Sequence, residues 1–487
     1  MEEKRIRIFH THIEVYPYTF HENERIEKQM SLWIDAEYRY DPVAYMVHND
    51  TLYLPRGFNI AILEKEFKST AFTVHDPDKL KSFRGVHMLY PPRNTIQEES
   101  INFLTTEGNF SDRRAFSQFA LTLDTGDGKT FVTINSIIKM GERAIIITHQ
   151  NKIKQQWLKT IEERTDMPLD KVMLINSSEM MIQIIENKID ANAYIYLANH
   201  QTIHNFMKNY GPELLSTFFK KIAVGIKVYD EAHLEFRNIL RIDFLTNTKK
   251  TIYLTANFGR SDNQEGQLFK KCFASSTKYG EETKNSIEKR KHIIYVPVLY
   301  RSNPSFNQIQ ATTNMYGFSA LKFSKYALHE DYHNSMLQTF YQILGMAVRL
   351  EGKILITTSR IDDTVYLKEL IEREYNYRDK NIATINSKNT EEQNENAKSC
   401  DIICSTIKSC GTGVDIKRLR CIINLEPFSS EIICNQLSGR LREYAPDKDT
   451  YFFDLVDLSF PACERQYNAR TRFLKKKCKN IQIFKLS

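Results

Sequence analysis

Apolar runs rich in β-branched residues recur along most of the chain, separated by amphipathic stretches long enough to form helices. A strand that is apolar throughout is typical of a parallel sheet, because the connecting helices bury both faces of such a sheet. The first set of these runs comprises residues 144–147, 193–197, 222–229 and 251–254. The pattern predicts an α/β unit in which helices cover both sides of a parallel sheet.

A second set of apolar runs follows a stretch, residues 302–317, that is rich in Asn, Ser, Gln and Thr. Its members are residues 353–357, 401–405, 420–425 and 450–455. This repetition predicts a second α/β unit, and a chain of 487 residues is too long for a single hydrophobic core. We expect the first unit at residues 89–285, a linker or insertion at 286–335, and the second unit at 336–487.

The first 88 residues have a different texture from the rest of the chain. Short runs with alternating apolar and polar residues indicate half-buried strands, and one stretch is compatible with a helix. The strand-like runs are residues 5–9, 37–40, 51–54 and 71–74, and the helical stretch is 60–67. We expect a small α+β domain at residues 1–88, which is a candidate for DNA binding.

Composition narrows the class of protein only slightly. The formal net charge of +7 is one that solubility alone would explain, so any basic surface must be local, with residues 475–479 as a short basic tail. Seven of the eight cysteines lie singly between Cys400 and Cys478, without zinc-site spacing, so we expect buried free thiols in a reducing cytoplasm. The sequence shows no signal peptide and no apolar run that could span a bilayer, so no membrane association is expected.

A glycine-containing loop, residues 121–130 with the sequence LTLDTGDGKT, joins an apolar run to a stretch able to form a helix. Gly126 and Gly128 permit a backbone that wraps closely around phosphate groups, with its N–H groups directed inward. Lys129 would place its ammonium on the β- and γ-phosphates, and Thr130 would offer its hydroxyl to Mg²⁺. The first glycine of the full GxxxxGKT pattern is replaced, so the loop alone leaves a chance occurrence open.

An acidic pair follows the third apolar run, in the sequence Asp230-Glu231-Ala232-His233. Two carboxylates at the end of a buried strand are costly unless they meet a cation or a proton donor. Asp230 is suited to hold Mg²⁺ through water, and Glu231 to orient or deprotonate an attacking water. A helix N-cap is the structural alternative, since Asp and Glu favour helix starts, but the glycine loop upstream favours a nucleotide site.

The motifs of residues 90–460 resemble those of the superfamily 2 helicases of DEAD/DEAH type and occur in the order of that family. The matching segments are residues 92–97, 121–130, 230–233, 254–257, 405–415 and 436–442. The fourth segment departs from the family's Thr-Ala-Thr, because its last residue is Asn257. The resemblance implies two tandem RecA-like parallel-sheet domains, preceded here by the small α+β domain, with ATP and Mg²⁺ bound in the cleft between them.

The resemblance assigns roles to residues of both units. Nucleotide contacts would come from Arg93, Gln97, Thr125, Gly126, Asp127, Gly128, Lys129, Thr130, His233, Gly413, Asp415 and Gln436. Lys129, Asp230 and Glu231 would be catalytic, and the metal ligands would be Thr130 and Asp230.

Two arginines of the last motif complete the catalytic set that the resemblance implies. Arg440 would reach the γ-phosphate as an arginine finger and stabilise charge in the transition state. The second arginine of the family lies three residues after the first, where this chain has Glu443. Arg442 falls one residue short of that position, so it is either a substitute for the missing arginine or a simple surface residue.

The resemblance also places loops that touch the nucleic-acid backbone at strand ends in both units. The candidate contacts are Thr148, Gln156, Gln201, Thr202, Thr358 and Thr406. Hydroxyls, amides and helix N-termini bind phosphates without reading the sequence, as a tracking motor requires. Ordinary capping at strand ends would explain the same residues equally well.

The Asp-Glu-Ala-His and Thr-Ala-Asn forms of the second and third motifs are similar to the branch of phage UvsW-like and XPB-like DNA helicases. The resemblance implies an ATP-dependent DNA helicase or translocase of bacteriophage type that remodels branched DNA in replication, recombination or repair. A monomer is expected, because two RecA-like units already form one ATP site. The alternatives are an RNA helicase acting on transcripts and a nucleotide-gated nucleic-acid-binding module with little turnover.

Overall fold

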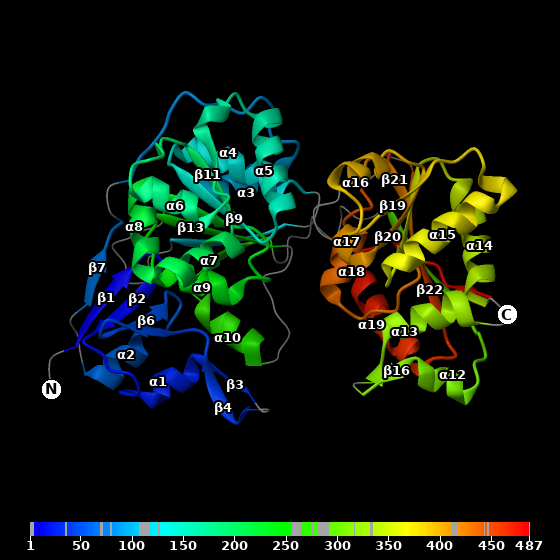
Figure 1. Cartoon of the computed structure of the whole chain (residues 1–487), viewed down its shortest axis with the longest axis horizontal. Helices are drawn as coiled ribbons and strands as arrows, with labels where there is room; N and C mark the ends of the chain where they lie inside the picture. Colours follow the sequence, from blue (N-terminus) through cyan, green and yellow to red (C-terminus); the bar gives the residue numbers. More distant parts are fainter. Residues whose placement is uncertain are drawn as a thin grey trace. The chain divides into compact units, whose positions relative to one another are not determined.

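The structure is a computed structural model of the chain, drawn in Figure 1. It describes residues 4–34, 37–68, 72–77, 80–106, 117–123, 127–255, 264–274, 276–280, 292–315, 317–331, 335–411, 416–442, 444–445 and 448–486. The chain divides into two compact units, the first ending at residue 281 and the second beginning at residue 282.

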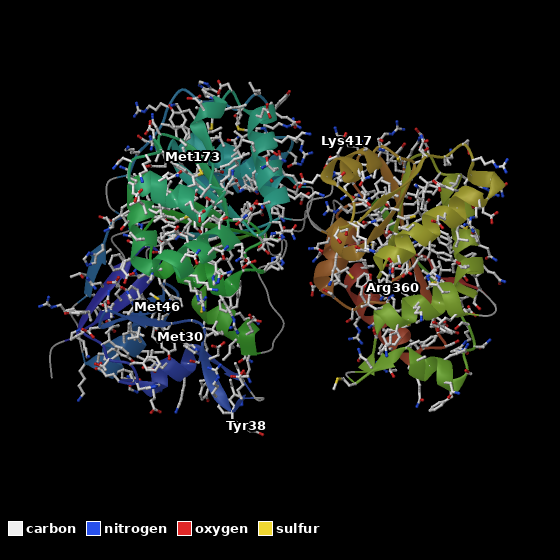
Figure 2. All side chains as sticks on the ribbon, in the orientation of Figure 1. Met30, Tyr38, Met46, Met173, Arg360 and Lys417 are labelled. Carbon is white, nitrogen blue, oxygen red and sulfur yellow. The ribbon has the colours of Figure 1, made fainter. Side chains whose placement is uncertain are left out.

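The first unit begins with a mostly antiparallel sheet of five strands in the order β5-β6-β2-β1-β7 (Figure 1). Its elements are β1 (Arg5–Phe9), β2 (His12–Tyr16), α1 (Glu24–Gln29), β5 (Met46–His48), β6 (Thr51–Pro55), α2 (Ile60–Phe67) and β7 (Phe72–His75). A separate hairpin of β3 (Ser31–Ile34) and β4 (Arg39–Pro42) carries Tyr38, which is 83% exposed and is labelled in Figure 2. The small β-rich region expected at the N-terminus is therefore present.

The main sheet of the first unit has seven strands, all paired in parallel, in the order β10-β11-β9-β12-β13-β8-β14. They are β8 (Gln118–Thr122), β9 (Ala144–Thr148), β10 (Val172–Leu174), β11 (Ile195–Asn199), β12 (Ile226–Tyr229), β13 (Lys250–Thr255) and β14 (Thr277–Tyr279). Because every pairing is parallel, the carboxyl ends of all these strands lie at one edge of the sheet.

Helices cover both faces of this sheet, as the apolar runs predict. One face packs against α3 (Thr95–Thr105), α4 (Lys129–Met140) and α5 (Asn151–Arg164). The other packs against α6 (Ser178–Ile185), α7 (His200–Tyr210), α8 (Pro212–Ile222), α9 (Phe236–Phe244) and α10 (Gln264–Cys272). Successive residues of β12 point to opposite faces, so Val228 joins the first core and Tyr229 the second.

The N-terminal sheet shares the second of these cores rather than forming a separate one. Its buried Ile13 and Leu52 belong to the same cluster as the residues of α7 to α10. Ser117 Oγ donates a hydrogen bond to the His10 carbonyl at 2.5 Å. Residues 1–88, expected as a domain of their own, are therefore packed onto the α/β part of the first unit as one compact body.

The second unit is built on another all-parallel sheet, in the order β19-β20-β18-β21-β22-β15-β23, with β24 also paired to β15. Its strands are β15 (Ile293–Tyr300), β18 (Lys353–Thr358), β19 (Ile382–Ile385), β20 (Ile402–Thr406), β21 (Leu419–Asn424), β22 (Thr450–Asp457), β23 (Asn480–Ile481) and β24 (Phe484–Lys485). One face packs against α13 (Ala320–Lys325), α14 (Ser335–Val348) and α15 (Ile361–Arg373), and the other against α16 (Glu391–Ala397), α17 (Ile407–Gly411) and α18 (Glu431–Ser438). The last helix, α19 (Pro461–Leu474), contributes to both cores.

β15 corrects the expected boundary of the second unit. The linker expected at residues 286–335 contains this fully buried strand, which pairs with β22 along its whole length. A proline in a strand argues against a central position, because it lacks a backbone N–H for the ladder. Pro297 is accommodated because it falls between the short pairings of β15 with β23 and with β24. The second sheet therefore begins at Ile293.

The prediction of two α/β units with parallel sheets is confirmed in both halves of the chain. All eight cysteines are free, and six of them are buried. In the described ranges, no helix combines the length and the apolar character needed to cross a bilayer.

Candidate functional site

The carboxyl edge of the seven-stranded sheet brings together the segments that the sequence singles out. β8 leads into the glycine loop, and β12 leads into the acidic pair. β9 and β11, on the other side of β12, end at Thr148 and Asn199, where two of the expected nucleic-acid loops begin. Ligands of open parallel sheets bind beyond the carboxyl ends of the strands, so this edge is the candidate site.

Gly128 gives the phosphate loop a conformation that a side chain would obstruct. Its φ is 92°, in the left-handed region, and a Cβ built on it would lie 2.4 Å from Gln97 Nε2. It precedes α4, whose first N–H groups have no partner within the helix and point outward, as anion binding requires. Thr125 and Gly126, the other expected loop residues, lie outside the described residues.

Gln97 braces this loop. It is 1% exposed, its Nε2 donates to the Asp127 carbonyl at 2.9 Å, and its Oε1 accepts from the Arg93 backbone N–H at 2.9 Å. The structure therefore brings three expected nucleotide-binding residues, Arg93, Gln97 and Asp127, into one hydrogen-bonded group. The amide of Gln97 fixes the backbone just before the glycine.

Lys129 points from the start of α4 toward the acidic pair. Its Nζ donates to the Leu123 carbonyl at 3.2 Å and lies 3.6 Å from Glu231 Oε1. The side chain is 11% exposed, so solvent screens its charge only partly. Thr130 follows it on the first turn of α4 and is half-buried. The glycine loop and the acidic pair, about one hundred residues apart in the sequence, thus meet at one point.

The two carboxyl groups of the pair differ in their electrostatics. Asp230 is 8% exposed, and burial, followed by the neighbouring charge of Glu231, raises its pKa to about 6. Burial alone would raise the pKa of Glu231 as well, but the charges of Lys129 and then His233 outweigh it and lower that pKa. Asp230 is thus the acid whose charge is least compensated, which suits a cation ligand, and Glu231 is the acid held ionised beside an ammonium.

His233 connects the acidic pair to the end of β13. Its Nδ1 lies 2.9 Å from Thr255 Oγ1 and 3.5 Å from Glu231 Oε2. Thr255 opens the segment that resembles the third motif, whose Asn257 lies outside the described residues. A displacement of Glu231 would therefore disturb the contact of His233 with Thr255 at the end of β13.

The residues present fit a magnesium–nucleotide. A loop with a left-handed glycine, a lysine and a hydroxyl meets a buried, under-compensated carboxylate, which is the donor set of a site that binds Mg²⁺ through phosphates and water. Within the described part of the chain there is no cluster of three or more His, Cys, Asp or Glu that could hold a metal alone.

The expected nucleic-acid contacts of the first unit fall into two groups. Thr148 is fully buried, and its hydroxyl donates to the Gln150 carbonyl at 3.1 Å, so it shapes the loop rather than offering a surface. Thr202 is 8% exposed, and its backbone N–H is capped by Asn199. Gln201 is exposed and Gln156 is half-buried, so these two side chains remain accessible.

The second unit shows the same division. Thr358, expected as a contact, is fully buried, and its hydroxyl lies 3.4 Å from Asp363 Oδ2. Arg360, which follows it at the start of α15 and is labelled in Figure 2, is partly exposed and lies 3.5 Å from the other oxygen of Asp363. Thr406 is 6% exposed and caps the first turn of α17 by accepting from the Ser409 N–H at 3.2 Å.

The residues of the last motif lie at the end of α18 in the second unit. Gln436 and Arg440 are half-buried, and Arg442 is exposed. Gly413 and Asp415, the other nucleotide contacts expected in this unit, lie outside the described residues.

The sequence reasoning missed one residue of the site. Trp157 is buried on α5, and its indole N–H donates to Asp230 Oδ2 at 2.8 Å. A buried tryptophan needs a hydrogen-bond acceptor for its N–H. This general requirement, and not a sequence motif, is the signal that could have identified Trp157 as part of the site.

Comparisons with known proteins agree with this arrangement. The family model described as "Type III restriction enzyme, res subunit" matches residues 91–260, which include the glycine loop and the acidic pair. The model described as "Helicase conserved C-terminal domain" matches residues 335–443, which include Arg440. No curated protein sequence matches the chain.

Solved structures share the fold at low sequence identity. S. cerevisiae Dbp5 bound to RNA and ADP BeF3 is 12% identical, with a TM-score of 0.51 over 80% of this chain and 89% of that chain. A fragment of an HsdR subunit of a type I restriction enzyme from Vibrio vulnificus YJ016 is 14% identical, with a TM-score of 0.50 over 82% of this chain and 70% of that chain. At these identities the likeness establishes the fold alone.

Proposed function

Since the two matched models indicate an ATP-hydrolysing helicase, we propose that this chain is a superfamily 2 motor that moves along DNA and remodels branched DNA such as replication forks and recombination intermediates. The observation that carries this proposal is the shared edge of the seven-stranded sheet. The nucleotide residues follow β8 and β12, and two accessible loops follow the adjacent β9 and β11. A motor needs this proximity, because hydrolysis must change the grip on a strand.

The chemistry proposed for the edge follows from its charges. Lys129 binds the β- and γ-phosphates, and Glu231 orients the attacking water and accepts its proton. Thr130 and, through water, Asp230 would hold Mg²⁺, which would supply positive charge to the phosphate oxygens. Arg440, contributed by the second unit, stabilises the charge that develops on the γ-phosphate.

The proposed movement follows from placing these groups on two units. A nucleotide that needs Arg440 as well as Lys129 favours a closed arrangement, and hydrolysis releases that preference. If both units hold the strand backbone through Gln201, Arg360 and the loops near them, each cycle advances the protein along one strand. A single chain carries both Lys129 and Arg440, so the proposed working form is a monomer.

Three features support DNA over RNA as the track. The second and third motifs depart from those of the DEAD-box RNA helicases. A β-rich region is packed against the motor and adds surface for a duplex. The matched family model and one structural neighbour are both named as subunits of restriction enzymes, which by definition act on DNA.

A panel of nucleic acids tests the proposal. We expect forked or four-way branched DNA to raise the rate of phosphate release most, single-stranded DNA less, and structured RNA least. A protein stimulated by RNA and not by DNA would contradict it. Strand displacement alone is a poorer test, since a branch-remodelling motor need not separate a simple duplex.

One observation supports each of the two alternative functions. The fold is shared with Dbp5, whose structure holds RNA, so an RNA helicase is the second candidate. Arg442 is exposed and out of register with the family's second arginine, which favours a nucleotide-gated binding module with little turnover. DNA binding that depends on ATP, without DNA-stimulated phosphate release, would support the module.

A further inference from the structure

Trp157 connects helix α5 to the acidic pair through a hydrogen bond. It lies on α5, is 1% exposed, and donates from its indole nitrogen to Asp230 Oδ2 at 2.8 Å. The other oxygen of the carboxylate, Oδ1, accepts from the Glu231 backbone N–H at 3.0 Å. The plane of this carboxylate is therefore fixed by two donors that come from different elements of the fold.

The start of α5 belongs to the surface expected to meet nucleic acid. Asn151, its first residue, is exposed and accepts a hydrogen bond from Asn199 Nδ2 at 2.6 Å. Asn199 ends β11 and caps α7, where Gln201 is exposed. The loops after β9 and β11 are thus joined to each other at the first turn of α5, within reach of a strand.

Asn151 and Trp157 lie six positions apart on α5. In an α-helix this is about 9 Å along the axis, a distance over which a helix moves as a rigid body. A displacement of the first turn of α5 would move the indole N–H by a similar amount. A hydrogen bond weakens steeply once its length or angle leaves a narrow range, so Asp230 would respond.

We propose that Trp157 is a positioning residue, which orients Asp230 toward the metal–nucleotide and couples that carboxylate to strand binding at the start of α5. The inference rests on the proposed function, because it takes Asp230 as the Mg²⁺ ligand and the α5 loop as a strand contact. Groups that hold a metal ligand from behind usually affect metal affinity or activity about tenfold or more. A tryptophan that only fills the core would not affect the Mg²⁺ requirement.

The chain offers a direct optical test, because it contains two tryptophans. Trp33 lies in β3, packed edge-on against Tyr40 and away from the site, so Trp33→Phe leaves Trp157 as the sole reporter. In this variant we expect the emission of Trp157 to change on adding ADP with Mg²⁺, and to change again on adding single-stranded DNA. Emission that stays constant while equilibrium dialysis shows bound Mg²⁺·ADP would overturn the inference.

Trp157→Phe tests the hydrogen bond itself, because it keeps an aromatic ring and removes the N–H. We expect the Mg²⁺ concentration for half-maximal hydrolysis to rise about tenfold, and the ratio of DNA-stimulated to basal rate to fall toward one. Trp33→Phe is the matched control for the Mg²⁺ requirement and should leave it unchanged. An unchanged Mg²⁺ requirement together with unchanged stimulation would leave Trp157 as a packing residue.

The two proposals fail in distinguishable ways. If the unaltered protein is stimulated by DNA and Trp157→Phe behaves identically, only the positioning role is lost. If the unaltered protein shows no stimulation by any nucleic acid, the proposed function fails and takes the coupling with it. The fluorescence measurement needs no change at Trp157, so a folding defect in Trp157→Phe does not remove the test.

Discussion

Two buried aspartates of the first unit, Asp230 at the end of β12 and Asp243 on α9, have very different surroundings. Asp243 accepts from Tyr229 and Tyr253 at 2.7 and 2.9 Å and is 2.7 Å from the ammonium of Lys227. Asp230 accepts from two N–H groups, while the nearby Lys129 pairs with Glu231 instead.

This difference separates an acid that holds the fold together from one that serves a ligand. The interior aspartate has a cation and two hydroxyls built around it, so its charge is matched before anything binds. The aspartate at the edge accepts from two N–H groups, and the charge of Lys129 offsets its burial only in part. Its pKa is therefore raised to about 6, so a cation from outside would stabilise its charged form. Buried acids with a raised pKa occur most often at functional sites, where a bound ligand supplies the opposite charge.

The largest effect should come from removing the lysine at the edge. We expect Lys129→Ala to lower the ATPase rate at least about a hundredfold, because the developing phosphate charge loses its clamp. The free energy of unfolding should fall by less than the cost of about 3–5 kcal/mol typical of a broken buried pair, since the 3.6 Å contact with Glu231 is long and both side chains keep some exposure. Steady-state phosphate release and urea unfolding measure the two quantities.

Lys139→Ala is the matched control for that experiment, because Lys139 is exposed on the same helix. It should leave both rate and stability unchanged. If Lys129→Ala kept its activity, or if it unfolded the protein, the edge and the interior would not differ in the way proposed.

The interior lysine should show the opposite pattern. Lys227 is completely buried, and its replacement in Lys227→Met leaves Asp243 without its cation, which typically costs about 3–5 kcal/mol. Basal ATPase activity of the molecules that remain folded should be close to normal. Thermal unfolding, with the exposed Lys208→Met as control, measures this.

A second variant sharpens the same prediction. Adding Asp243→Asn to Lys227→Met removes the uncompensated charge, so part of the lost stability should return. No recovery in the double variant would mean that packing around Lys227, and not the buried charge, accounts for the loss.

Sequence patterns predict most of the residues at the carboxyl edge of the first sheet and few of those around Asp243. The glycine loop and the acidic pair are local patterns, and strands that end in them must meet at one edge of a parallel sheet, so Lys129, Asp230 and Glu231 could be predicted. The group around Asp243 has no such pattern, because its members come from β12, β13 and α9 and meet only through packing.

Other differences have equally specific causes. Thr148 and Thr358 match the residue types of a strand contact, but the end of a buried strand also buries its last side chain, which composition alone does not reveal. β15 falls within residues 286–335, expected as a linker because of the polar stretch at 302–317. Pro297 interrupts the apolar run of β15, and the gap between β23 and β24 that accommodates this proline is a tertiary feature. The hydrogen bond of Trp157 could not be predicted, because its acceptor lies on a strand end 73 residues away in the sequence.

The smallest expected effect concerns a half-buried acid, Glu426, which lies just beyond β21 at the carboxyl edge of the second sheet. Burial raises the pKa of Glu426 from 4.5 to about 7, as it does for Asp230 in the first unit. The folded state therefore holds this proton more tightly than the unfolded state. The resulting contribution to stability is fully present below pH 4.5 and is lost as the pH rises to about 7.

Glu426→Gln should remove this dependence, because the amide stays neutral at every pH. We expect the variant to exceed the unaltered protein in free energy of unfolding at pH 8 by about 1–3 kcal/mol, and to differ little at pH 4.5. Urea unfolding at the two pH values measures this, with the exposed Glu372→Gln of α15 as control. If Glu426→Gln gained nothing at pH 8, the charge of Glu426 would already be matched as that of Asp243 is. An unmatched acid at a carboxyl edge would then be particular to Asp230, and the contrast between edge and interior would belong to the first unit alone.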